Sequence, residues 1–146
     1  MRIGVGSDHR GFGLKQTIRR HLSERGYIVV DFGCTSPESC DYPDFAYPVA
    51  RAVASGEVDL GVLICSNGVG MSMVANKVRG VRAALCTSKQ MASQSRRHND
   101  ANVLALGADN LPEPENVAIL DEWLAATFEG GRHERRLRKM AEGECS

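Results

Sequence analysis

The stretch that decides the fold is Leu60-Gly61-Val62-Leu63-Ile64-Cys65-Ser66-Asn67-Gly68-Val69-Gly70. Its first six residues are apolar at nearly every position, which is typical of a parallel strand covered on both faces. Residues 66–70 then predict a turn, and a helix is expected to follow as far as about Val78. A buried strand, a glycine turn and a helix in this order are one repeating unit of an α/β fold.

The same alternation continues outward in both directions along the chain. Further strands are predicted at 3–7, 27–30, 82–86 and 103–107, and helices at 11–25, 44–55, 88–99, beyond Pro114 and beyond Gly131. Because strands alternate with helices, we expect βαβ crossovers and a five-stranded parallel sheet with helices on both faces. A length of 146 residues predicts a single domain, 1–146.

The composition is that of an ordinary globular protein. Lys plus Arg and Asp plus Glu number 18 each, which excludes a globally basic nucleic-acid binder but not a local basic patch. No apolar run approaches the roughly 20 residues that span a bilayer, and the chain opens on a strand-like segment rather than a signal peptide. We expect a cytoplasmic protein with reduced thiols and no membrane or nucleic-acid partner. The Cys and His spacings predict no metal site.

Candidate site residues follow the predicted strands, because ligands of open α/β sheets bind beyond the carboxyl ends of the strands. Asp8 and His9 follow the first strand, and Cys65 with its glycine turn ends the third. We expect His98 and His133 in or beside these loops as well. Asp8 fits a sugar-hydroxyl acceptor, although lone aspartates near turns are more often caps.

Cys65 has two interpretations that its position alone does not separate. Gly68 and Gly70 would let the backbone approach a ligand and present N–H groups to an anion or oxyanion at a helix start. The helix dipole would favour the thiolate of Cys65 there. In the other interpretation Cys65 is a small apolar residue at the end of a buried strand. Cys86 has no glycine turn behind it, so only the second interpretation applies to it.

Arg132 and Arg136 are one helical turn apart and share a face, as a bidentate phosphate site requires. Other basic residues surround them, so the spacing alone favours a solvated basic helix. A second motif, Gly4-Val5-Gly6-Ser7-Asp8-His9, begins like a dinucleotide fingerprint. It has His9 where the third glycine belongs, so we predict no dinucleotide site.

Six motifs together resemble the type B ribose-5-phosphate isomerases, a family that includes galactose-6-phosphate and allose-6-phosphate isomerases. The resemblance covers essentially the whole chain, and six motifs in order are far more specific than one. They are Ser7-Asp8-His9-x-Gly11-Phe12, Asp41-Tyr42-Pro43-Asp44-Phe45, Cys65-x-x-Gly68-Val69-Gly70, Ala75-Asn76-Lys77, Arg97-His98-Asn99-Asp100-x-Asn102 and Gly130-Gly131-Arg132-His133.

The resemblance implies a Rossmann-like three-layer α/β/α domain. It implies a homodimer, in some members a tetramer, with the active site at the subunit interface. The implied activity interconverts ribose 5-phosphate and ribulose 5-phosphate by ring opening and a cis-enediolate, with no metal or organic cofactor. An enediolate needs a base near neutral pKa and fixed N–H donors, which fits the turn at Cys65.

The resemblance also implies roles for single residues. Cys65 resembles the base that moves a proton between C1 and C2. His98, with Asn99 beside it, resembles the ring-opening acid/base that reaches in from the partner subunit. The amides of Gly68, Val69 and Gly70 resemble the oxyanion site, and Asp8 and Tyr42 resemble the contacts to the sugar. The phosphate clamp is resembled by His9 together with Arg132, Arg136 and His133, which belong to a last helix at about 132–142.

Position 67 departs from the family pattern. Many members carry Thr or Ser there, and that hydroxyl helps to move a proton at a substrate oxygen, whereas Asn67 donates a hydrogen bond without readily exchanging a proton. Either Asn67 only polarises the oxygen, or Ser66 or a water takes over. A hexose 6-phosphate or tetrose 4-phosphate substrate, or a non-catalytic sugar-phosphate or nucleotide-binding module, therefore stay as alternatives.

Overall fold

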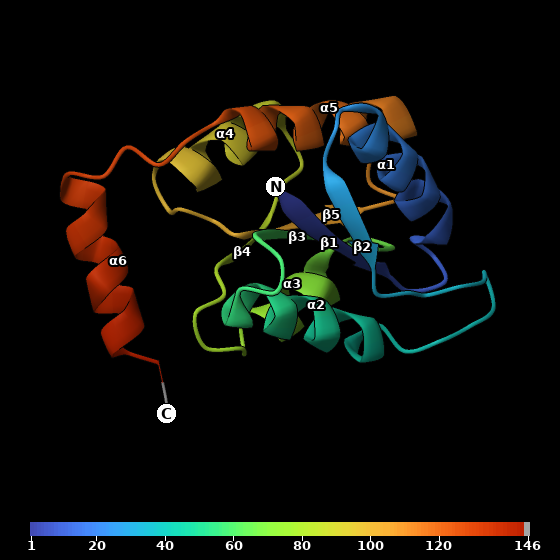
Figure 1. Cartoon of the computed structure of the whole chain (residues 1–146), viewed down its shortest axis with the longest axis horizontal. Coiled ribbons are helices and arrows are strands. Elements are labelled where there is room, and N and C mark those ends of the chain that lie inside the picture. The colour runs from blue at the N-terminus through green and yellow to red at the C-terminus, as the bar shows by residue number, and fades with distance from the viewer. Residues whose placement is uncertain (145–146) are drawn as a thin grey trace.

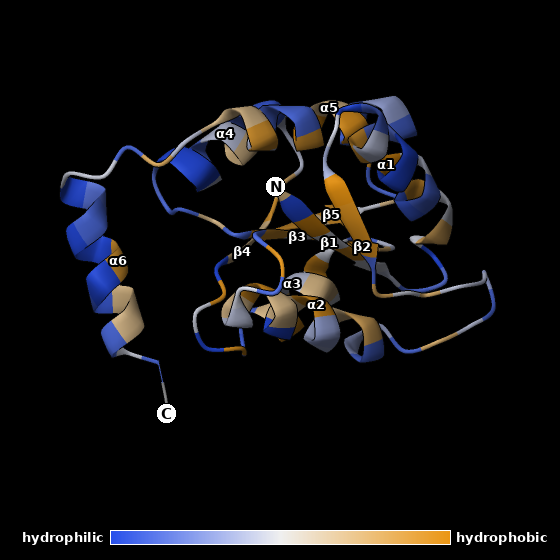
Figure 2. Ribbon diagram, in the orientation of Figure 1, coloured by the Kyte–Doolittle hydropathy of each residue, from blue (hydrophilic) through white to orange (hydrophobic). Residues whose placement is uncertain are grey.

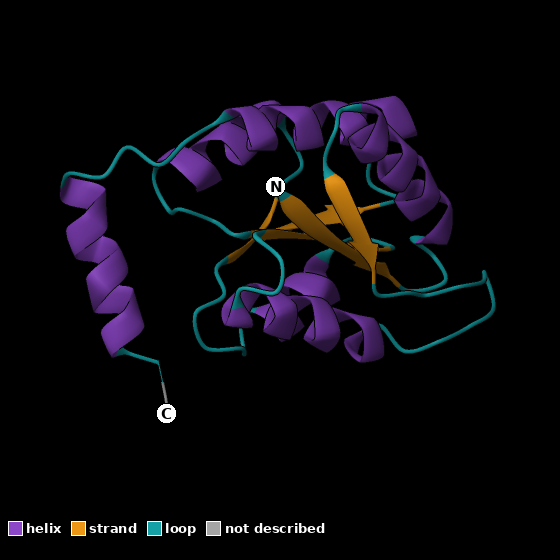
Figure 3. Cartoon of the chain, viewed as in Figure 1, coloured by secondary structure: helices purple, strands orange, loops and turns teal. Residues whose placement is uncertain are grey.

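The computed structural model describes residues 1–144, which form a parallel sheet between two layers of helices (Figures 1 and 3). This is the α/β architecture predicted from the alternating strands and helices. The elements in chain order are β1 (Arg2–Ser7), α1 (Phe12–Glu24), β2 (Ile28–Asp31), α2 (Pro43–Ser55), β3 (Leu60–Cys65), α3 (Val69–Ala75), β4 (Ala83–Leu85), α4 (Lys89–Arg97), β5 (Val103–Gly107), α5 (Glu113–Ala125) and α6 (Arg132–Glu142).

The sheet has the strand order β2-β1-β3-β5-β4, and its paired strands are all parallel. The chain moves from β1 outward to β2 on one side, and from β3 toward β4 on the other. The carboxyl ends of β1 and β3 therefore flank a topological switch point, the usual place for a ligand in such sheets. Asp8 and Cys65 lie at these two strand ends.

Two apolar cores explain why β3 is apolar throughout. Val62 and Ile64 belong to the core beneath α1, α4 and α5, whereas Leu63 and Cys65 belong to the core beneath α2 and α3. Successive residues of a strand point to opposite faces, so a strand covered on both faces needs an apolar side chain at every position. Figure 2 shows the hydrophobic strands between the two helical layers.

Helix α6 stands apart from the three layers (Figure 1). None of its residues is buried, and its surface is mostly hydrophilic (Figure 2). The segment beyond it is tied to the body through Glu144, whose Oε2 accepts a hydrogen bond from the N–H of Gly80 at 3.1 Å. Cys145, the fifth cysteine, lies outside the described residues.

Two helices are shorter than the sequence predicts. The helix after the glycine turn ends at Ala75 rather than near Val78, because the side chain of Asn76 pairs with the backbone of Ala83 through hydrogen bonds of 2.8 and 3.0 Å. Helix α4 ends at Arg97, so His98 is its C-cap. Within residues 1–144, we find no helix with the length and apolarity that crossing a membrane requires.

Candidate active site

The turn after β3 holds Cys65 next to a glycine with left-handed backbone. Cys65 is only 5 % exposed, and its Sγ accepts a hydrogen bond from the N–H of Gly68 at 3.2 Å. Gly68 has φ +81°, which lets the chain fold back over the sulfur. Both interpretations of Cys65 keep some support, because it is buried like a strand-ending apolar residue and yet its sulfur is held by a backbone amide.

Close packing fixes this turn from two sides. A Cβ at Gly68 would lie 2.5 Å from Cδ1 of Leu85, and a Cβ at Gly70 would lie 2.5 Å from Cε1 of Tyr42. The ring of Tyr42 therefore lies directly against the turn. Among residues 1–144, no acceptor is found for the N–H groups of Gly70 and Met71, as is usual in the first turn of a helix.

Asn67 contributes to the same turn with one end of its side chain. Its Oδ1 accepts a hydrogen bond from the N–H of Val69 at 3.0 Å. Of the three amides assigned to the oxyanion site by resemblance, those of Gly68 and Val69 are therefore engaged by the protein, and that of Gly70 is free. The amide nitrogen of Asn67 remains available as a donor, since the residue is exposed.

Asp8 and His9 lie beside Cys65, as predicted from the strand ends. The N–H of Asp8 donates to the carbonyl of Ile64, the neighbour of Cys65, at 3.2 Å. Asp8 is buried, and its Oδ1 accepts hydrogen bonds from the N–H groups of Arg10 and Gly11 at 2.9 and 3.1 Å. One carboxylate oxygen thus acts as a turn cap. Nδ1 of His9 accepts a hydrogen bond from the N–H of Cys40 at 3.2 Å, which fixes the ring.

An exposed ion pair that the sequence did not reveal stands near the turn. Arg10 donates a hydrogen bond of 2.8 Å to Asp109, whose own N–H donates to the carbonyl of Ser66 at 2.9 Å. This hydrogen bond holds the pKa of Asp109 below its ordinary value and raises that of Arg10. The guanidinium of Arg10 is therefore paired with a carboxylate on the surface.

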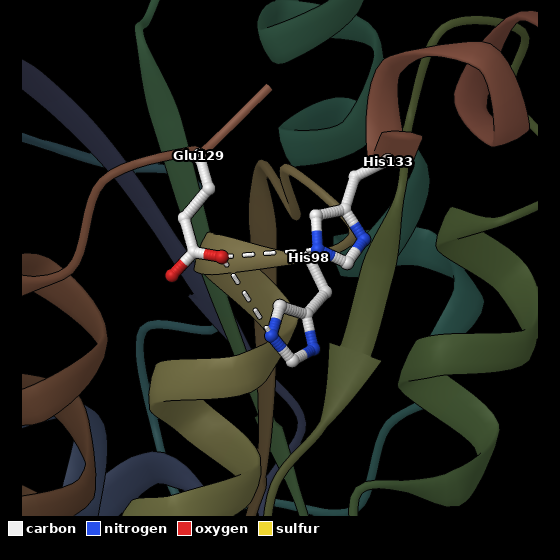
Figure 4. A group of neighbouring side chains, drawn as sticks. All are labelled: His98, Glu129 and His133. Atoms are coloured by element: carbon white, nitrogen blue, oxygen red, sulfur yellow. Dashed lines mark ion pairs between the residues drawn. The ribbon is translucent and has the colours of Figure 1, made fainter. Parts of the chain in front are cut away.

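A second group of functional side chains, which we term the imidazole cluster, consists of His98, Glu129 and His133 (Figure 4). The two rings are stacked with centroids 4.5 Å apart and planes inclined by 13°. Oε1 of Glu129 lies 3.7 Å from Nε2 of His133 and 4.0 Å from Nε2 of His98. The cluster joins the end of α4, the α5–α6 linker and the start of α6.

The pKa values of Glu129 and His133 are both lowered within the imidazole cluster. Arg97 donates a hydrogen bond to Glu129 and holds the pKa of that carboxyl below its usual range. Burial lowers the pKa of His133, and the neighbouring His98 and Arg132 lower it further. His133 is thus biased toward the neutral ring, whereas Glu129 stays ionised.

The predicted phosphate ligands of α6 lie on the surface. Arg132 and Arg136 are both exposed and four residues apart on the helix, which places them on one face. Asn99 is exposed as well and lines a cavity of about 440 Å³ between β4 and the end of α6. Within the single chain these basic side chains face solvent, as the solvated-helix interpretation expected.

The structure corrects the placement of His98 and His133. We expected them in or beside the loops at the carboxyl ends of the strands, but they lie at the opposite edge of the sheet. Helix α4 runs back toward the amino end of β5, and the backbone of Asn102 pairs with Arg82 just before β4. Cys65 is level with Gly107 at the other end of β5, so this strand of five residues alone separates the two groups by roughly 13 Å.

The imidazole cluster also raises the question of a metal ion. Its three ligand-type atoms all lie within 4.8 Å of one another. The sequence spacing did not indicate this group, because Glu129 and His98 are 31 residues apart. The rings are nearly parallel, however, and the in-plane lone pairs of stacked imidazoles do not converge on one ion. The arrangement suits a carboxylate shared by two ring N–H groups better than a metal centre.

Comparison with known proteins relates the chain to one enzyme family. A family model described as Ribose/Galactose Isomerase matches residues 3–140. Ribose-5-phosphate isomerase B of Escherichia coli strain K12 is 51 % identical over 136 residues, which are 93 % of this chain and 91 % of that protein.

Solved structures agree with this match. Ribose-5-phosphate isomerase B of Clostridium thermocellum superposes with a TM-score of 0.96 at 54 % identity, over 97 % of this chain and 96 % of that one. The Mycoplasma genitalium enzyme, solved with bound ribulose-5-phosphate, superposes with a TM-score of 0.94 at 46 % identity, over 97 % of this chain and 94 % of that one. The fold and the ordered motifs thus point to the same family.

Proposed function

This chain belongs to the ribose/galactose isomerase family, and on that premise we propose that it interconverts ribose 5-phosphate and ribulose 5-phosphate. The relatives named ribose-5-phosphate isomerase B support this substrate pair, as does the M. genitalium structure with bound ribulose-5-phosphate. The observation that carries the proposal is the turn after β3, where the sulfur of Cys65 lies beside backbone amides. We further propose that the enzyme acts in the cytoplasm.

The chemistry begins at Cys65. As a thiolate it takes the proton from C2 of the open-chain aldose, and the electron pair forms the C1–C2 double bond of a cis-enediolate. Delivery of that proton to C1 then gives the ketose. A hydrogen bond to the charged form stabilises a thiolate, and Gly68 supplies one. The N–H of Gly70, for which the described residues offer no acceptor, is the donor proposed for the developing oxyanion, where fixed donors are most effective.

Asn67 supports a polarising role at the substrate oxygen. With Oδ1 engaged by Val69, its side-chain NH₂ is the end free to donate. An amide does not exchange a proton at catalytic rates, so the oxygen-to-oxygen proton transfer passes through Ser66 or a water. Asp8 and Tyr42, which flank the turn, are proposed to hold the sugar hydroxyls.

A second copy of the chain completes the site in this proposal. His98 and Asn99 would open the furanose ring of substrate bound at the partner's turn. His9 of the same chain as Cys65 would bind the phosphate together with Arg132, His133 and Arg136 of the partner. The phosphate then acts as a remote handle whose binding energy orients the reacting carbons.

The state of α6 supports the homodimer. An isolated helix shorter than about 12–15 residues is marginal in water, and α6 has 11 residues with none buried. Met140 is 50 % exposed on this helix, and Tyr42, Val69 and Met73 are exposed near the glycine turn. Packing α6 and these side chains against a second copy would bury apolar surface and bring the two halves of the site together.

The test is a coupled assay on the wild type and the Cys65→Ala variant. We expect the variant to lose activity on the order of 10²–10⁴-fold, the usual contribution of a general base. Equal activity would remove Cys65 from the mechanism. Arg136→Ala should raise KM for ribose 5-phosphate and lower kcat, because the phosphate handle also orients the substrate; an unchanged kcat/KM would exclude Arg136 from the clamp.

A second substrate class stays open because of Asn67. Its side chain differs from the hydroxyl of many family members, so a hexose 6-phosphate or a tetrose 4-phosphate is the alternative. Equal concentrations of these sugar phosphates should rank ribose 5-phosphate first. If another sugar phosphate is isomerised far faster, the substrate assignment is wrong while the chemistry at Cys65 stands.

A further inference from the structure

Glu129 lies beside the two stacked imidazoles of the imidazole cluster, with its Oε1 directed toward both rings (Figure 4). Nε of Arg97 donates a hydrogen bond to Oε2 at 2.7 Å, and Nη2 forms an ion pair with the same oxygen, also at 2.7 Å. The N–H of Glu129 also donates to the carbonyl of Arg97 at 3.0 Å. With Oε2 and its own backbone both tied to Arg97, Glu129 presents Oε1 to the two ring nitrogens.

The surroundings of the imidazole cluster are otherwise positive. Among residues 1–144, Arg97, Arg132 and Arg136 are the cations near it, and Glu129 is the neighbour that favours a proton on His133. The lowered pKa of His133 keeps that ring neutral near pH 7. The negative charge on Oε1 is therefore available to the other ring, that of His98.

We propose that Glu129 is a positioning residue that stabilises His98 in its positively charged form during ring opening. This inference rests on the proposed function. In the ring-opening step the anomeric hydroxyl loses its proton to His98 while the C1 carbonyl forms. The bond from C1 to the ring oxygen breaks, and that oxygen takes a proton in turn. His98 is positive only between these two proton transfers, when the carboxylate at 4.0 Å lowers the energy of its imidazolium.

The substrate pair allows ring opening to be separated from proton transfer at carbon. Ribulose 5-phosphate cannot close to a furanose, because its C5 oxygen carries the phosphate. Enolisation of the ketose at Cys65 therefore needs no ring opening, whereas isomerisation of ribose 5-phosphate does. A residue that serves only His98 therefore affects the isomerisation of ribose 5-phosphate and spares the enolisation of ribulose 5-phosphate.

The experiment compares two rates for the full-length Glu129→Gln enzyme. The first is kcat/KM for ribose 5-phosphate. The second is the rate at which ribulose 5-phosphate loses its C1 hydrogen in D₂O, either by exchange with solvent or by conversion to product. NMR follows this loss. We expect the first rate to fall about 10- to 100-fold, less than the full range of general acid–base catalysis. The second rate should stay within about twofold, because Cys65 is untouched.

Matched variants make the comparison decisive. Glu134→Gln removes an exposed carboxylate from the first turn of α6 and should leave both rates unchanged. Arg97→Gln frees the carboxylate to turn away and should show the same split as Glu129→Gln. Gln keeps the size of Glu at a side chain that is 41 % exposed, so the fold is preserved.

Two outcomes would overturn the inference. If both rates fall together in Glu129→Gln, the residue only anchors α6 with its phosphate-binding arginines. If neither rate changes, the carboxylate does not assist His98. Cys65→Ala tests the proposed function separately, since it should abolish both rates; a Cys65→Ala enzyme that retained both would refute the reaction scheme itself.

Discussion

The two regions that carry the proposed chemistry differ in how the fold supports them. The turn after β3 is built into the sheet, with Cys65 buried and Gly68 and Gly70 pressed against Leu85 and Tyr42. At the opposite end of the sheet the imidazole cluster joins His98, the C-cap of α4, to the α5–α6 linker and the start of α6, and no residue of α6 is buried. The region proposed to hold the reactive atom is closely packed, and the region proposed to reach a second chain is exposed.

This difference indicates what each region contributes. A base and an oxyanion donor need positions fixed to a fraction of an ångström, and a packed sheet edge supplies them. A phosphate clamp can come from an exposed helix such as α6, which carries Arg132 and Arg136. Proteins lose less stability by placing exposed basic side chains on such a helix than by burying them.

Mixing two inactive variants would test the division of the site between chains most directly. Cys65→Ala and His98→Ala homodimers should each be nearly inactive. When the two are unfolded together and refolded, half of the dimers should be mixed, and each mixed dimer should contain one intact site. We therefore expect recovery of about a quarter of wild-type activity. If each site were formed within one chain, no activity would be recovered. That result would show that the two regions do not act across a subunit interface.

Replacing one glycine by alanine in each region should destabilise the closely packed backbone more than the loosely packed one. In Gly68→Ala the new Cβ would lie 2.5 Å from Leu85, at φ +81°, so we expect a loss of about 2–4 kcal/mol from overpacking and strain. Gly130→Ala in the linker has φ +70° with no atom within 4 Å of the new Cβ, so about 1 kcal/mol is expected. Urea unfolding measures both variants. Equal losses would show that packing does not fix the turn.

The order of elements and the carboxyl-edge half of the site were predictable because they depend on local signals. Apolar runs, glycine turns and alternating helices predicted the parallel sheet, and the rule for strand ends brought Asp8 and Cys65 together. Where a tertiary contact ends an element, the element is shorter than its sequence pattern predicts. Asn76 ends α3 by pairing with Ala83, seven residues away on an edge strand.

The imidazole cluster was not predictable from spacing. His98 follows a strand by only one helix, and we placed it at the wrong edge because a helix returns the chain to the opposite end of the sheet. Glu129 had no motif to mark it, since its contacts to Arg97 and His98 form only once α5 has packed beside α4. Such contacts follow from tertiary structure and leave no periodic pattern.

The smallest expected effect concerns the pH dependence of stability at the exposed region. The pKa of His133 is lower in the folded chain than its ordinary value of 6.5, so the unfolded chain takes up the proton first as the pH falls. Stability that is present above pH 6.5 is therefore lost as the pH falls below it. The pKa of Glu129 is also lowered, from 4.5, so its contribution is lost only in more acidic solution.

Replacing His133 by Asn should flatten the decline of Tm between about pH 6.5 and pH 5 and leave the decline below pH 4.5 in place. Thermal melts of the wild type and His133→Asn across this range measure the difference. An unchanged slope would mean that the pKa of His133 is not lowered by folding.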